Sequence, residues 1–125
     1  MVVGVMLSGL RFAGAQEASE ADSGSAGQVI VSQRAIRHIE ERHWPNSAAQ
    51  GAGKFSPGIT ENVFRELVNE AVAGGQVRQN THGRLGKIYE YDFGHAIGVT
   101  MDGRPAYRLR VVVNQWNRLV TAFPF

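Results

Sequence analysis

The stretch "AYRLRVVVN", residues 106–114, has the residue alternation of a β-strand. Successive side chains of a strand point to opposite faces, which places Tyr107, Leu109, Val111 and Val113 on one face and Arg108, Arg110 and Val112 on the other. We expect the first set to pack in the core. The two arginines are then either solvated or paired as a clamp for phosphate.

Further β-like stretches lie on both sides of this strand. Residues 76–80 and 86–94 are separated by "THGRL", which is typical of a hairpin loop. Residues 96–101 precede Asp102-Gly103, a turn signal, and residues 118–125 follow a short turn around Trp116-Asn117. Because parallel crossovers need a dozen or more residues, connections this short predict an antiparallel sheet, here of four to five strands.

Two helices are predicted before the strands. Ser32 is a good N-cap for the first, which cannot continue past Trp44 because Pro45 follows. Thr60 caps the second, which ends at Gly74-Gly75 and is apolar at Val63, Phe64, Leu67, Val68 and Ala71, the spacing of one buried face. Residues 46–58 between the helices are expected to form a loop. The fold class is therefore α+β, with two N-terminal helices packed on one face of a twisted antiparallel sheet.

Residues 1–28 differ in composition from the rest of the chain. Ala13–Gln28 are mostly small or acidic and include no aromatic residue, which indicates a flexible linker, so the folded domain is expected to span residues 29–125. Residues 1–16 resemble a secretory signal but lack a basic N-terminal region, which favours the tail of an upstream region. No segment approaches the ~20 apolar residues of a membrane-spanning helix.

Composition excludes some chemistry and favours one kind of partner. The chain of 125 residues has no cysteine, which excludes disulfides, thiolate nucleophiles and thiolate zinc sites. Residues 1–28 hold one basic and three acidic residues, which leaves 12 basic and 8 acidic residues in the predicted domain. Most of the bases are arginine, so a polyanionic partner such as RNA is favoured.

The stretch "RHIEERHWP", residues 37–45, carries two of the four histidines. His38 and His43 lie about 140° apart on a helix, so they cannot clamp one metal as i, i+4 histidines do. His43 continues the apolar stripe of Ile36 and Ile39 at the helix C-terminus, where the dipole favours the protonated form. It is either a packed residue paired with the dipole or a proton-transfer group.

Other candidate residues are scattered along the chain. Lys54 is a cation in the loop after the first helix, and Thr121 places a hydroxyl in the apolar run "LVTAF", where β-propensity alone would explain it. Tyr91 alternates with acidic residues in "KIYEYDF" and is suited either to stacking on a base or to the edge of the core. His38 is expected on the surface or in contact with a strand, and His82 and His95 are expected in solvent.

The order of these pieces resembles a known family. A histidine near the end of the first helix, "GKF" at 53–55, "YEYDFG" at 89–94 and "TAFP" at 121–124 are similar to C-terminal toxin domains of polymorphic bacterial toxins. More narrowly, residues 29–125 resemble contact-dependent growth inhibition toxins of the superfamily that joins barnase, EndoU, colicin D and RelE. The resemblance implies a helix pair on a twisted antiparallel sheet and cleavage of RNA, often transfer RNA, without a metal or cofactor.

The resemblance also implies roles for individual residues. His43 takes the acid/base role, Lys54 and Arg110 neutralise phosphate, Thr121 supplies a late-strand hydroxyl and Tyr91 contacts the substrate on the sheet face. The sequence lacks the paired-histidine "GxHH" wording of close EndoU relatives. The second acid/base therefore remains open, with His38 and His82 as candidates.

Partners and delivery follow from the same resemblance. A toxin of this kind is secreted or displayed as part of a larger protein, acts in the target-cell cytoplasm and is blocked by a cognate immunity protein over its active site. The alternative is a non-catalytic module that binds RNA or a protein. A metal-dependent nuclease of the His-Asn-His type is disfavoured, because it needs a ββα arrangement with clustered histidines.

Overall fold

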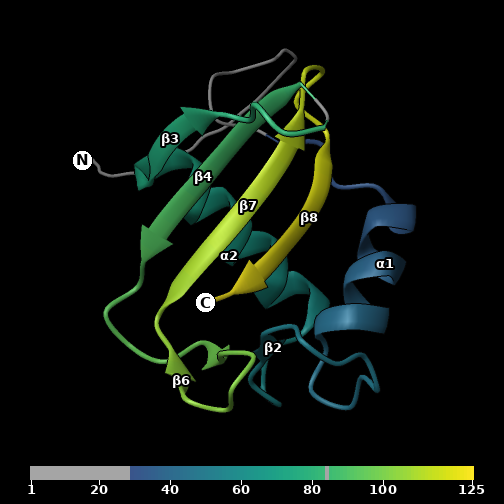
Figure 1. Cartoon of the computed structure of the whole chain (residues 1–125), viewed down its shortest axis with the longest axis vertical. Helices are drawn as coiled ribbons and strands as arrows, with labels where there is room; N and C mark the ends of the chain where they lie inside the picture. Colours follow the sequence, from purple (N-terminus) through teal and green to yellow (C-terminus); the bar gives the residue numbers. More distant parts are fainter. Residues whose placement is uncertain (1–28, 84) are drawn as a thin grey trace, which may run out of the picture.

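The computed structural model describes residues 29–83 and 85–125, so the expected linker at residues 1–28 lies outside the described residues. It confirms the α+β fold class with two helices, and it contains two antiparallel sheets where one was expected (Figure 1). The larger sheet contains, in order, β3 (Gln76–Gln79), β4 (Gly86–Asp92), β7 (Arg108–Asn114) and β8 (Leu119–Pro124). The smaller sheet contains β2 (Lys54–Phe55), β5 (Gly98–Val99) and β6 (Pro105–Ala106).

Both helices begin and end where local signals predict. Helix α1 (Gln33–His43) is capped by Ser32, whose hydroxyl accepts a hydrogen bond from the backbone N–H of Ala35. Helix α2 (Glu61–Gly74) is capped by Thr60. Helix α1 stops because Trp44 is extended, as the residue before a proline tends to be.

The core lies between α2 and the inner face of the larger sheet. Figure 1 shows α2 crossing behind β4 and β7, while α1 stands beside the edge strand β8. Leu109, Val111 and Val113 are buried, which confirms the predicted inner face of β7. Tyr107 departs from this prediction and is 47% exposed, because it lies between β6 and β7, outside the larger sheet.

The smaller sheet corrects two expectations. The expected loop at residues 46–58 contains β2, and residues 96–101 contribute only the two residues of β5, which pairs with β2 and β6 rather than joining the larger sheet. Gly98 permits this pairing, since a Cβ there would come within 2.1 Å of the Lys54 carbonyl oxygen. The larger sheet therefore has four strands.

A β-bulge in β8 decides which side chains reach the outer face of the sheet. Val112 pairs with Thr121, whereas Val113 pairs with Leu119, so Val120 has no partner in the register. Leu119 and Ala122 are both buried in spite of their odd spacing. The bulge thus turns Thr121 outward, onto the face that carries Arg110 and Phe123.

Candidate functional site

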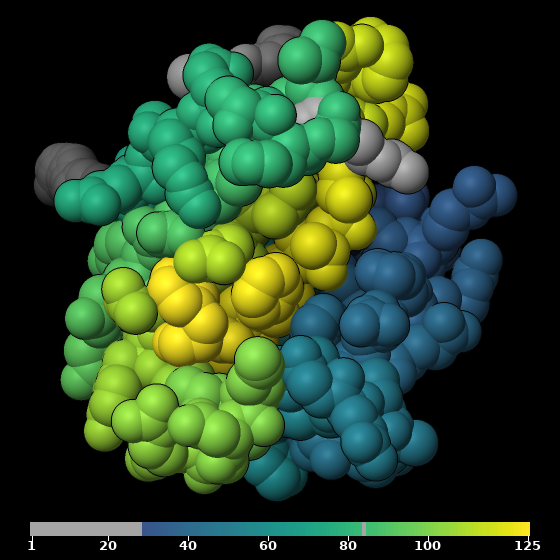
Figure 2. All heavy atoms as spheres, in the orientation of Figure 1, coloured from purple at the N-terminus to yellow at the C-terminus, as the bar shows by residue number. Residues whose placement is uncertain are grey.

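A cavity of about 510 Å³ opens on the outer face of the larger sheet, next to α1. Its walls come from α1, the loop at residues 51–53, the turn after β5, and the strands β7 and β8. Figure 2 shows this face, with the C-terminal residues in yellow lying between the blue α1 side and the yellow-green β5–β6 region. Its lining includes His38, Arg42, His43, Arg110, Thr121 and Phe123. No acidic side chain of the described residues lines this cavity, so its charge favours an anion.

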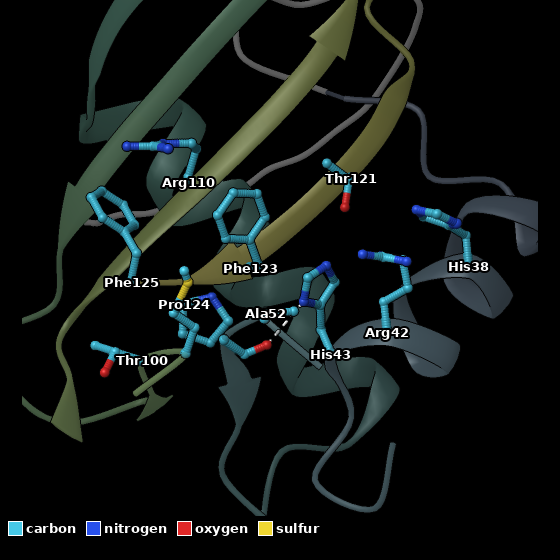
Figure 3. A pocket seen from close by; sticks show the side chains of 13 residues that line it. His38, Arg42, His43, Ala52, Thr100, Arg110, Thr121, Phe123, Pro124 and Phe125 are labelled. Carbon is cyan, nitrogen blue, oxygen red and sulfur yellow. Dashed lines mark hydrogen bonds between the residues drawn. The ribbon is translucent and has the colours of Figure 1, made fainter. Parts of the chain in front are cut away.

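His43 is held in one orientation. Its ring lies 2.9 Å from the Gly53 carbonyl oxygen through Nδ1 and stacks on Phe123, with ring centroids 5.3 Å apart. A carbonyl oxygen only accepts hydrogen bonds, so Nδ1 carries the proton of the neutral ring and Nε2 keeps its lone pair. Figure 3 shows the second ring nitrogen facing the space between Thr121 and Arg42.

Burial sets the protonation of His43. The side chain is 6% exposed, and desolvation lowers its pKa below the ordinary value of 6.5. The hydrogen bond to Gly53 works in the opposite direction, and the positive charge of Arg42 lowers the pKa further. The expectation that the helix end favours the charged ring is therefore wrong here, because loss of hydration outweighs the dipole. The neutral ring is a base with an available lone pair.

Gly53 explains how the loop brings its carbonyl to His43. A Cβ at this position would lie 2.2 Å from the Pro124 carbonyl oxygen and 3.1 Å from that of Val99. Only a residue without a side chain lets the loop approach β8 and β5 this closely. The "GKF" segment therefore has a positional role beside the histidine.

Arg110 lies on the outer face of β7, as the strand alternation predicts. Its Nε donates to Glu90 at 2.6 Å, and its guanidinium carbon lies 4.3 Å from the centroid of the Phe125 ring. These contacts orient the guanidinium along the cavity wall. Arg42 forms no ion pair within the described part of the chain, so its charge is available to a ligand.

Thr121 contributes a buried hydroxyl to the cavity. Its oxygen makes no hydrogen bond within the described part of the chain. Figure 3 shows this oxygen directed to the side on which His43 and Arg42 lie. Because an unpaired buried polar group costs about 1–3 kcal/mol, the hydroxyl is suited to a bound ligand.

Two predicted site residues are not brought to the cavity. Lys54 does not line it, and its Nζ instead donates to the Ala49 carbonyl oxygen at 2.5 Å. Tyr91 pairs with Leu109 and so lies on the core face, opposite Arg110. Its ring is held there against α2, since a Cβ on Gly74 would lie 3.1 Å from it.

The candidates for a second acid/base are separated by the fold. His82 is in the β3–β4 loop, where its Nδ1 lies 3.3 Å from the Thr81 hydroxyl, and it does not line the cavity. His38 is exposed, as predicted, and nevertheless borders the cavity. Residues four apart on a helix share a face, so Arg42 is placed next to His38. Arg42 was not among the predicted site residues, although its spacing of four residues from His38 could have identified it.

Thr100 and Met101 also line the cavity and were not predicted. They belong to the turn that follows β5, and no local pattern relates this turn to α1. The pairing of β5 with β2 and β6 in the smaller sheet brings the turn to the site.

No protein-family model, curated protein or solved structure matches this chain. Among the residues that the structure describes, no group of three or more histidine, aspartate or glutamate side chains is placed to hold a metal ion. The described helices include none long and apolar enough to cross a membrane. Fold and site together define a small α+β domain with a cationic cavity around one oriented, neutral histidine.

Proposed function

We propose that this domain is an endoribonuclease that cleaves RNA through attack by the substrate's own 2′-hydroxyl, with His43 as the general base. The observation that carries the proposal is the orientation of His43. The bond from Nδ1 to Gly53 and the stacking on Phe123 leave Nε2 as a base that faces a cationic cavity. This is the arrangement that proton abstraction beside a phosphate requires.

The reaction balances without a covalent enzyme intermediate. Nε2 of His43 removes the proton of the 2′-hydroxyl, whose oxygen attacks the adjacent phosphorus. The bond from phosphorus to the 5′ oxygen breaks, and that oxygen takes up a proton from His38. The products are a 2′,3′-cyclic phosphate and a 5′-hydroxyl. We assign the acid to His38 because it borders the cavity and His82 does not. Each proton transfer contributes roughly 10²- to 10⁴-fold to the rate.

The remaining groups of the cavity suit the pentavalent phosphorane. Arg42 supplies a positive charge that no described carboxylate pairs, Arg110 supplies guanidinium N–H groups beside its ion pair with Glu90, and the Thr121 hydroxyl supplies a hydrogen-bond donor. Fixed donors at such a site contribute about 3 kcal/mol each to lowering the barrier. Lys54, whose ammonium group bonds to Ala49, has no part in this assignment.

The biological setting rests on the sequence resemblance. We propose that the domain is a toxin delivered as part of a larger secreted or surface-displayed protein, that its substrate is transfer RNA, and that a cognate immunity protein covers the cavity. An acidic surface on that partner would complement Arg42 and Arg110 and would accelerate association at low ionic strength.

The test is cleavage of total transfer RNA by the purified domain in excess EDTA. We expect 2′,3′-cyclic phosphate ends from the wild type and from His82→Ala, a matched control in an exposed loop. His43→Ala should remain folded and lose cleavage. Near-normal cleavage by His43→Ala contradicts the proposal, as does a requirement for added divalent metal. A gel shift without loss of RNA would identify a binding module instead.

A further inference from the structure

A second hollow of about 400 Å³ adjoins the His43 cavity. The two share Thr100 and Phe125 as lining residues, so they form neighbouring parts of one surface. The second hollow is also lined by Tyr107, Arg108 and Asp92. None of these three lines the His43 cavity, so the site extends beyond the groups assigned to the chemical step.

An aromatic ring and an available cation meet in this hollow. Tyr107 is 47% exposed, although it is a large and partly apolar side chain. The Arg108 guanidinium carbon lies 4.3 Å from the centroid of the Phe125 ring, and within the described part of the chain Arg108 forms no ion pair. Exposed aromatic rings next to arginines are the features that hold single-stranded nucleic acid, through stacking on bases and contact with phosphates.

The chemistry of the hollow favours a nucleotide over a bare anion. Asp92 lies opposite Arg108 in the strand register, and one of its oxygens accepts a hydrogen bond from the Gly94 backbone N–H at 2.8 Å. A carboxylate repels a second phosphate but accepts hydrogen bonds from the N–H groups of a base. The hollow thus offers a stacking surface, a phosphate contact and an acceptor in one place.

We propose that this second hollow binds the nucleotide next to the scissile phosphate, with its base stacked on Tyr107 and its phosphate bound by Arg108. The inference rests on the proposed function and extends it to the substrate class. A base stacked on a side chain cannot remain paired in a helix, so the substrate is an unpaired segment that spans at least two nucleotides.

The experiment measures binding rather than cleavage. A fluorescently labelled single-stranded DNA hexamer lacks the 2′-hydroxyl and cannot react by the proposed route, so its anisotropy reports affinity alone. Tyr107→Ala should weaken binding about 5- to 150-fold, the range of one base–aromatic contact. Tyr107→Phe should retain wild-type affinity because it keeps the ring. Trp116→Ala is the matched control, since Trp116 is an exposed aromatic of the β7–β8 turn.

The salt dependence of binding tests the phosphate contact of Arg108. Arg108→Ala should reduce the slope of log affinity against log salt by about 0.7, the value for one phosphate contact on a single strand. Arg118→Ala, at an exposed arginine directly before β8, should leave the slope unchanged. Equal slopes for wild type and Arg108→Ala overturn the phosphate contact.

Two results would overturn the proposal that this hollow is a nucleotide subsite. One is equal affinity of wild type and Tyr107→Ala. The other is wild-type protein that binds no oligonucleotide. Cleavage of RNA by the wild type and its loss in His43→Ala are scored separately, so the nuclease proposal can stand while the subsite fails.

Discussion

Replacing Thr121 by valine is expected to change stability and activity in opposite directions. The substitution keeps the shape of the side chain and removes a hydroxyl that is buried without a hydrogen bond in the described part of the chain. An unpaired buried polar group costs about 1–3 kcal/mol. We therefore expect Thr121→Val to increase the free energy of unfolding by about 1–2 kcal/mol, which raises the midpoint of thermal unfolding by roughly 4 °C or more.

The matched control is the same substitution at Thr60. Its hydroxyl accepts a hydrogen bond from the Val63 backbone N–H at 3.2 Å and caps α2. Thr60→Val should lower the free energy of unfolding by about 0.5–2 kcal/mol, because the cap is lost. The two variants thus make one chemical change with opposite expected signs, and urea unfolding followed by circular dichroism measures both.

Activity separates a functional hydroxyl from a structural one. If the Thr121 hydroxyl donates to the phosphorane, Thr121→Val should reduce kcat for RNA cleavage about 100-fold, as loss of one fixed donor does. Thr60→Val should cleave at the wild-type rate at a temperature where it is folded. A less stable Thr121→Val protein would refute the reasoning about the buried hydroxyl, and an unchanged kcat would refute its role in the reaction.

Two further predictions concern His43. Gly53→Ala should displace the loop that positions the ring, because its Cβ would lie 2.2 Å from the Pro124 carbonyl oxygen, and we expect a loss of at least 10-fold in kcat/KM with the fold retained in circular dichroism. The lowered pKa of His43 predicts that this group does not affect stability well above pH 6.5, where the ring is neutral in both states. Stability falls as the pH drops through about 6.5, because the unfolded chain binds the proton first. Urea unfolding measures the free energy of unfolding at pH 7.5 and at pH 5.5. The decrease in this free energy between the two pH values should be smaller for His43→Gln than for wild type, and equal decreases would contradict the assigned pKa direction.

The ends of the helices and the alternation of β7 were predictable because they depend on neighbours in the sequence. Ser32 and Thr60 cap the helices on which they stand, and Trp44 is extended before Pro45. His43 was placed on the buried stripe of α1 by its spacing from Ile36 and Ile39 alone, and it is indeed buried with them. The nuclease function itself remains a prediction that rests on the cavity and on the resemblance.

The composition of the cavity required the tertiary structure. Tyr91 and Arg110 lie on adjacent strands, but the register pairs Tyr91 with Leu109 and thus puts it on the other face. Lys54 follows α1 closely in sequence, yet its ammonium group bonds to the Ala49 carbonyl oxygen. Both placements away from the cavity arise because a residue's neighbours across a sheet or loop are not encoded in its position along the chain.

The amino-acid sequence alone determined where each helix starts and stops, that the later half of the chain forms antiparallel strands, and that His43 lies inward on α1. Only the tertiary structure decided that a bulge at Val120 turns Thr121 outward and that the turn after β5 comes to lie against α1. The physical reason is the distance along the chain over which each effect acts. Caps, prolines and side-chain periodicity act within a few residues, whereas a bulge and a pocket depend on the partner strand and on the packing of segments distant in sequence.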